Sequence, residues 1–234
     1  MARNRKHLKR HSMPTSWPSQ RKLITFITRP NPGSMKRDYV VALVVLLRDV
    51  LGLVHTTKEA KFAVNKEYIK INGVVATDIK APIGMFDIVE ITKTKQKISF
   101  VFDEFGKVKV IDVKDDVLPV KVRNKTVIKG GKYQINGFNG FNIVVDSKEA
   151  AKIPTNSTIL VDLAKKKITK TLELGQKAQV YVMDGKYVGT SGEITEITKY
   201  NGVAPDLVTI KTKSGEHTTS LNYCFVLDSL GRVQ

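Results

Sequence analysis

The first 37 residues contain ten Lys or Arg residues and not one Asp or Glu, and the first carboxylate of the chain belongs to Asp38. A segment with this charge repels itself and has too few apolar residues to build a core of its own. Prolines, beginning with Pro14 and ending with Pro32, also interrupt any helix there. We therefore expect residues 1–37 to form a basic extended arm whose charge is balanced by something outside the chain.

The whole chain has 39 Lys or Arg residues and 22 Asp or Glu residues, a net charge of +17. More than half of this excess lies in the arm, which favours a polyanionic partner such as nucleic acid, an anionic membrane surface or an acidic protein. The longest apolar run, Tyr39 to Leu47, has nine residues, whereas a membrane span needs about 20. No apolar segment directly follows the basic N-terminus, as a signal peptide requires. The single cysteine, Cys224, suits a reducing compartment, so we expect a cytoplasmic protein.

Two helices are expected after the arm. In residues 38–54, Val40, Val44, Leu47 and Leu51 recur at helical spacing and Gly52 is a plausible end. The valine content also permits a strand, although the segment is long for one. The second helix begins at Thr56, because Thr56-x-x-Glu59 is a capping box.

The remainder of the chain is expected to be β-structure. The sequence EYIKINGVVATDI has Asn72-Gly73 between two short strands, a strong signal for a hairpin. After Lys93, short alternating or apolar runs are separated by turns such as DEFG, KDD and GGKYQINGFNG. The pattern predicts a central all-β domain, a barrel or sandwich, over residues 97–172, and another small β-domain over residues 173–234. The fold class is therefore multi-domain α+β, mainly β.

No catalytic constellation is present in the sequence. His7-x-x-x-His11 has metal-ligand spacing, but the arm supplies no thiolate or carboxylate to complete a zinc site. Cys224 lies in the apolar run NYCFVL, where a cysteine is normally a small buried hydrophobe. Phosphate-binding glycine loops and the G-x-S-x-G nucleophile motif are also missing from the sequence. We expect a binding protein rather than an enzyme, with no cofactor, no metal and no small-molecule substrate.

Four stretches, in order, resemble one protein family. HLKR followed by a Trp and then RPNPGSMKR resembles its basic extension, and LRDVLGLVHTTKEAKFAVNKEYIKINGVVATDIKAPIGMFDIVEI resembles its helix-helix-hairpin RNA-binding module of the alpha-L type. Within that module, IKINGVVATDI and the following P-x-G-x-x-D-x-V are the most specific part. GQKAQVYVMDGKYVGTSGEITEI resembles a KOW motif on an SH3-like barrel. The family is protein four of the archaeal and eukaryotic small ribosomal subunit, the "e" type, and the likeness covers nearly the whole length.

The resemblance implies a structural ribosomal protein whose partners are small-subunit rRNA and neighbouring ribosomal proteins. It implies four parts: the arm (1–37), the RNA-binding module (38–96), the central all-β domain (97–172) and the KOW domain (173–234). The central domain, with its acidic turns, is expected to serve architecture or protein contacts.

The expected RNA contacts fall into three groups. Phosphates reward Lys and Arg without any readout of the base sequence, and an indole can stack on unpaired bases. The arm contributes Arg3, Arg5, Lys6, His7, Lys9, Arg10, His11, Trp17, Arg21, Lys22, Arg29, Lys36 and Arg37. The RNA-binding module contributes Lys58, Lys61, Lys66 and Lys70, and the KOW domain contributes Lys177, Lys186, Tyr187 and Lys199. Tyr187 suits packing inside the barrel equally well.

Two other functions fit parts of the pattern. A non-ribosomal transcription or translation factor can carry a KOW motif and visit RNA transiently, but such a factor rarely needs a long basic arm. An RNA-modifying enzyme, or an accessory protein for RNA modification, can use the same helix module as an RNA handle. An enzyme of that kind needs a pocket-forming α/β domain, and residues 97–172 show only short strands and turns.

Overall fold

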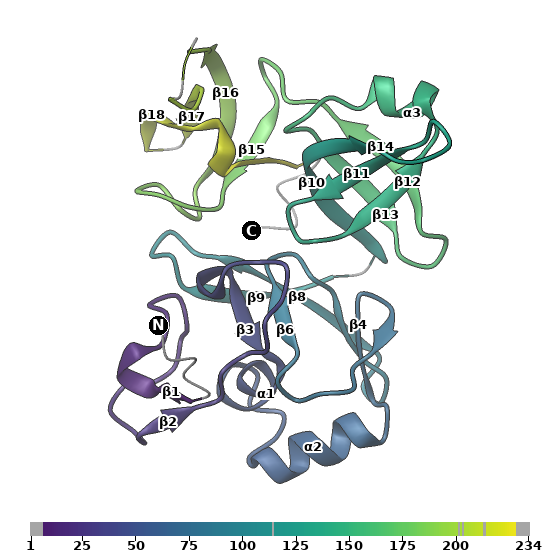
Figure 1. Cartoon of the computed structure of the whole chain (residues 1–234). Helices are drawn as coiled ribbons and strands as arrows, with labels where there is room; N and C mark the ends of the chain where they lie inside the picture. The colour runs from purple at the N-terminus through teal and green to yellow at the C-terminus, as the bar shows by residue number, and fades with distance from the viewer. Residues whose placement is uncertain (1–6, 114, 201, 203, 213, 228–234) are drawn as a thin grey trace, which may run out of the picture. The chain divides into compact units, whose positions relative to one another are not determined.

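The computed structural model describes residues 7–113, 115–200, 202, 204–212 and 214–227. It is mainly β, with several sheets and short helices, which confirms the expected class (Figure 1). The chain divides into two compact units. The first contains the described residues up to Val101 and those from Lys107 to Val113, and the second contains Phe102–Gly106 and the described residues from Asp115 onward. None of the helices in the described part has the length and apolar character that a membrane crossing needs.

The first unit is built on one five-stranded sheet and two short ribbons. The sheet has the strand order β5-β4-β7-β8-β9. Its strands are β4 (Ile69–Ile71), β5 (Val74–Val75), β7 (Val89–Ile91), β8 (Gln96–Phe102) and β9 (Val108–Asp112). The ribbons are the antiparallel pairs β1 (Leu8–Lys9) with β2 (Phe26–Ile27) and β3 (Val40–Ala42) with β6 (Pro82–Gly84). Single-turn helices η1 (Arg10–Ser12) and η2 (Arg37–Tyr39) interrupt the N-terminal segment.

The first helix begins later than its apolar spacing predicts. Residues 40–42 form strand β3, and only then do α1 (Leu43–Val45) and the π-helical η3 (Leu46–Val50) follow. The β-branched Val40 and Val41 favour the strand. No side chain caps this helix, and its first amides are satisfied from outside it: the N–H of Leu43 donates to Ala81 O and that of Val44 to Ile79 O, both at 3.0 Å. Gly52, with φ of +65°, ends the helix as expected.

The second helix confirms its capping box. Helix α2 (Thr57–Asn65) follows Thr56, whose hydroxyl accepts from the N–H of Glu59 at 3.2 Å. The Glu59 carboxylate reaches back and accepts from the N–H of His55 at 2.8 Å. The His55 N–H, and the Thr56 hydroxyl at 3.0 Å, both donate to the Glu59 carboxylate and lower its pKa, because they favour its charged form. The helix start is therefore set by local sequence alone.

The Asn72-Gly73 turn joins β4 to β5 as predicted, with φ of +49° and +78° at its two residues. The Asn72 side chain donates to Asp87 at 2.8 Å and accepts from the N–H of Ile88 at 2.8 Å. Asp87 also accepts from the N–H of Gly84 at 2.6 Å. Burial raises the pKa of Asp87. The P-x-G-x-x-D-x-V stretch thus links two turns of the first unit through hydrogen bonds.

The second unit contains two five-stranded antiparallel sheets. The central sheet has the order β12-β11-β10-β13-β14, and the C-terminal sheet has the order β18-β17-β16-β15-β19. The central strands are β10 (Val117–Val127), β11 (Tyr133–Gly137), β12 (Asn142–Val145), β13 (Thr158–Asp162) and β14 (Lys167–Leu172), with α3 (Ser147–Lys152) between β12 and β13. The C-terminal elements are β15 (Gln179–Val182), β16 (Ser191–Thr198), β17 (Leu207–Thr212), β18 (Gly215–Ser220), η4 (Leu221–Tyr223) and β19 (Cys224–Val226). Each sheet has its own apolar cluster.

A buried lysine connects these two sheets. Lys121 of β10 is 3% exposed, and its Nζ donates to the carbonyls of Leu221, Asn222 and Cys224 at 3.0, 2.9 and 2.7 Å. Burial lowers the pKa of Lys121 to about 8, so the side chain still carries its proton at neutral pH. Cys224 is fully buried, and burial raises the pKa of its thiol to about 11. The expectation that this cysteine is a small buried hydrophobe is confirmed.

The turn between β8 and β9 packs against the C-terminal sheet within the second unit. The buried phenol of Tyr181 donates to the Phe102 carbonyl at 2.7 Å and accepts from the Phe102 N–H at 2.8 Å. Gly189 has φ of +79°, and a Cβ atom on it would overlap the carbonyl of Asp103. Glycine is therefore required at this position for two reasons, the backbone conformation and the close approach of another backbone.

Candidate nucleic-acid interface

Over residues 7–37 the structure differs from the expected extended arm. Leu8, Met13, Trp17 and Ile27 are all buried. Trp17 is only 2% exposed, and its Nε1–H donates to the carbonyl of Val40 at 2.9 Å. The predicted stacking of Trp17 on RNA is thus incorrect for this structure, because a buried indole presents no ring face to a base. The apolar residues, spaced too widely for a core of their own, are buried within the first unit.

Arg10 is also buried, so it is not placed to contact phosphate as predicted. It is 2% exposed, and its Nη1 donates to Ser19 Oγ at 3.0 Å and to the Gln20 carbonyl at 2.6 Å. Its Nη2 lies 3.9 Å from Asp49 Oδ2. Asp49 also holds Arg48, with Arg48 Nε 2.7 Å from Asp49 Oδ1. The guanidinium of Arg10 therefore anchors the N-terminal segment to η3 instead of facing a partner.

Most of the other described residues of this segment that were predicted to contact RNA are exposed. Arg29 is half-buried, and Arg3, Arg5 and Lys6 lie outside the described residues. The exposed ones are His7, Lys9, His11, Arg21, Lys22, Lys36 and Arg37. Within the described part of the chain, no group of three or more His, Cys, Asp or Glu side chains is placed to hold a metal ion. The exposed Lys and Arg side chains carry the positive charge that phosphate attracts.

Helix α2 presents a basic face. Ala60 and Val64 are buried on its inner side. The predicted Lys58, Lys61 and Lys66 are all exposed, and Lys70 on β4 is half-buried. Between the lysines lies Phe62, which is 57% exposed, with the Lys66 Nζ 5.9 Å from its ring centroid. Phe62 was not among the predicted contact residues. Its position directly after Lys61, on the polar side of an amphipathic helix, indicates an exposed aromatic ring.

In the C-terminal sheet region, the predicted Lys177, Lys186 and Lys199 are exposed. Tyr187 is half-buried and stacks on His217, with ring centroids 4.2 Å apart and an interplanar angle of 14°. The Lys186 Nζ lies 5.4 Å from the Tyr187 centroid. Tyr187 therefore packs on His217 and is still partly exposed, and His217 is a partner that the sequence did not indicate.

The central region carries more positive charge than its acidic turns suggest. Residues 97–172 contain fifteen Lys or Arg against eight Asp or Glu, a net charge of +7. Residues 38–96 have a net charge of +1, with eight basic and seven acidic residues. At the turn before β14 and its first residue, Lys165, Lys166 and Lys167 are all exposed. After the N-terminal segment, the central region is thus the main source of positive charge. The acidic turns alone do not indicate this excess.

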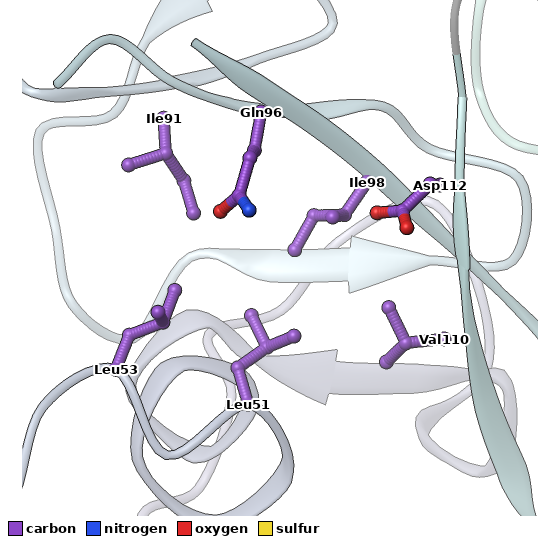
Figure 2. Close-up of a pocket in the computed structure, with 7 residues that line it drawn as sticks. All are labelled: Leu51, Leu53, Ile91, Gln96, Ile98, Val110 and Asp112. Atoms are coloured by element: carbon purple, nitrogen blue, oxygen red, sulfur yellow. The ribbon is translucent and has the colours of Figure 1, made fainter. Parts of the chain in front are cut away.

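An apolar pocket of the first unit has a different character. It encloses about 310 Å³, and Figure 2 shows Leu51 and Leu53 directed toward the side chains of Ile91 and Ile98. Its polar lining residues are Gln96 and Asp112. A lone carboxylate among aliphatic side chains has no basic or nucleophilic partner for general acid–base or covalent chemistry. We therefore place no catalytic site in this pocket.

Comparisons with known proteins agree with these features. The sequence model of the ribosomal family S4e matches residues 94–168. Small ribosomal subunit protein eS4 of Methanococcus maripaludis is 33% identical over 95% of this chain and 94% of its own length. The eS4 protein of Archaeoglobus fulgidus is 33% identical over 94% of this chain and 92% of its own length.

A solved structure supports the same fold. The crystal structure of the 30S ribosomal protein S4e from Thermoplasma acidophilum superposes with a TM-score of 0.68 at 22% identity, covering 82% of this chain and 96% of that one. The names of these relatives describe a ribosomal protein, which confirms the expectation of a ribosomal constituent rather than an enzyme. With a third of its residues identical to those of full-length relatives, the chain belongs to the family of small ribosomal subunit protein eS4.

Proposed function

We propose that the chain is a structural constituent of the small ribosomal subunit in the cytoplasm, where it binds and orders rRNA beside neighbouring ribosomal proteins. The observation that carries this proposal is membership of the eS4 family over almost the entire length. The exposed cations support it, because they are spread over several folded parts of the chain, as expected for contacts with several RNA segments.

The roles of the parts are also proposed here. Residues 38–96 act as an alpha-L-type RNA-binding module, with the basic face of α2 against RNA. Residues 173–234 act as a KOW domain on an SH3-like barrel, and the tight approach at Gly189 supports this assignment. Residues 97–172 are the central part of the chain in sequence, although β8 and β9 join the sheet of the first unit. The net charge of +7 over these residues extends the role we expected for them from architecture to RNA contact. Residues 1–37 form a basic segment that is partly integrated into the first unit.

Family membership favours a resident component over a transient factor, and sedimentation separates the two. We expect the protein to remain with small ribosomal subunits after a wash at high salt, because a resident component has much of its basic surface covered by RNA. The measurement is the fraction of protein that co-sediments with the subunit before and after the wash. Complete release into the supernatant, with the subunit intact, contradicts residence and favours the transient factor.

The exposed cations of the N-terminal segment should contribute measurable salt dependence to rRNA binding. In the quadruple variant Lys9→Gln, Lys22→Gln, Lys36→Gln and Arg37→Gln, we expect the log–log slope of affinity against salt to decrease by about 3, taking about 0.7 per lost contact. The four positions are exposed, so the melting temperature should not change. A deletion of the segment is less informative, because it also removes buried residues such as Trp17.

A charge-preserving variant is the matched control for this measurement. The variant Lys9→Arg, Lys22→Arg, Lys36→Arg and Arg37→Lys keeps every charge, so the slope of affinity against salt should not change. If the Gln variant has the same slope as the unmodified protein, these four side chains do not contact phosphate and the proposed role of the segment fails.

A further inference from the structure

A second pocket lies in the most basic part of the first unit. It encloses about 310 Å³ and is lined by residues from the β1–β2 ribbon, from η3, from the start of α2 and from the loop before β6. The residues that matter for its chemistry are His7, Ile24, Phe26, Arg29, Arg48 and Lys80. This volume is at the lower end of ligand pockets, which range from about 300 to 1,000 Å³. The pocket therefore suits a small group, such as one nucleotide.

Phe26 gives the pocket an aromatic wall. It is 53% exposed, although most phenylalanines in a folded protein are buried. The ring of His7 lies beside it, with centroids 5.8 Å apart and a tilt of 56° between the planes. Ile24 is 56% exposed and lies in the same pocket. An exposed aromatic ring with apolar support is the kind of platform on which proteins stack unpaired bases.

The same pocket is lined by three basic side chains from separate parts of the chain. Arg29 follows β2, Arg48 belongs to η3, and Lys80 precedes β6. Arg48 is fixed in place, because its guanidinium bonds Asp49 at 2.7 and 3.0 Å and Thr57 Oγ1 at 3.1 Å. None of the described residues that line the pocket is acidic. Two carboxylates outside the lining lie close to these cations: Asp49 binds Arg48, and Asp78 accepts from the Lys80 N–H at 2.9 Å. The three cations outnumber these two carboxylates, so the pocket favours an anion next to the aromatic wall.

We propose that this pocket binds one unstacked nucleotide of the RNA, with its base against Phe26 and its phosphate near Lys80 and Arg29. The inference rests on the proposed function, since it names the local chemistry of the RNA that this protein holds. A nucleotide contacts both features, because its base can stack on the aromatic wall and its phosphate can bind the cations. An apolar peptide would leave the three cations without an anionic partner, and a bare phosphate would leave the exposed ring without a stacking partner. Phe26 thereby takes the stacking role that Trp17 cannot fill.

The test compares full-length variants in binding to small-subunit rRNA. Phe26→Ala should lower the affinity roughly tenfold or more, because base–aromatic stacking is lost, while the salt slope stays the same because no charge changes. Lys80→Gln should lower both the affinity and the slope, the slope by about 0.7. Leu53→Ala is the matched control, because Leu53 is 47% exposed and lines the other pocket of the first unit, to which no RNA contact is assigned. It should bind like the unmodified protein.

Further variants distinguish ring stacking from a simple apolar contact and from a protein contact. Phe26→Trp should retain the affinity, and Phe26→Leu should lose it, because leucine keeps the apolar contact without a ring. Equal binding by Phe26→Ala, or full binding by Phe26→Leu, overturns the proposal while the unmodified protein still binds rRNA. Weakened incorporation into subunits with unchanged rRNA affinity assigns Phe26 to a protein contact and overturns it as well. If the unmodified protein does not bind rRNA, the proposed function itself has failed.

Discussion

Replacing Trp17 by alanine should lower the free energy of unfolding of the first unit by about 3–5 kcal/mol, as for other buried aromatic residues. The side chain is 2% exposed and packs within the first unit, where its Nε1–H donates to the Val40 carbonyl. Removal leaves a cavity and deprives the Val40 carbonyl of its donor. The measurement is urea unfolding followed by circular dichroism, with hydrogen exchange to locate the loss in the first unit.

Trp17→Phe is the matched control for this prediction. It keeps an aromatic ring in the core, so it should lower the free energy of unfolding much less than Trp17→Ala does. The remaining cost comes from the loss of the Nε1–H donor. The affinity of folded Trp17→Ala protein for rRNA should change little, because the indole faces the protein interior. An unchanged unfolding curve combined with weaker rRNA binding contradicts the core assignment and returns Trp17 to the RNA surface.

Gly189→Ala should cost about 2–5 kcal/mol in the second unit, from two sources. A left-handed backbone conformation, here with φ of +79°, costs an alanine roughly 1–2 kcal/mol. The new Cβ also overlaps the Asp103 carbonyl, and forcing atoms into a packed site typically costs about 1–3 kcal/mol more. The measurement is the unfolding free energy, with hydrogen exchange of Phe102–Gly106 to show whether the turn is displaced.

Gly185→Ala separates these two sources. Gly185 has φ of +90°, but the nearest atom to a Cβ placed there is a side-chain carbon of Tyr223 at 3.4 Å. The substitution therefore introduces the backbone strain without the overlap, and should cost only about 1–2 kcal/mol. Equal costs at the two positions contradict the close packing of Gly189 on the turn that follows β8.

Some elements were predictable because their signals are local. The start of α2 follows from a hydroxyl and a carboxylate three residues apart, which bond the same backbone turn whatever surrounds them. The Asn72-Gly73 turn follows from two residues that accept positive φ. The strands of the second unit follow from alternation and turn residues. The exposure of Lys58, Lys61 and Lys66 follows from the helical period of their neighbours.

The sequence by itself determined the local elements, the mainly β class and the resemblance to a ribosomal family. Only the tertiary structure decided which basic and aromatic residues of the N-terminal segment face outward. Trp17 and Arg10 are buried, whereas Phe26 is exposed. Composition and spacing within the segment do not distinguish them, because the partners are distant in sequence: Val40 for the Trp17 indole and Asp49 for the Arg10 guanidinium. Burial depends on these long-range contacts, and a local pattern carries no information about them.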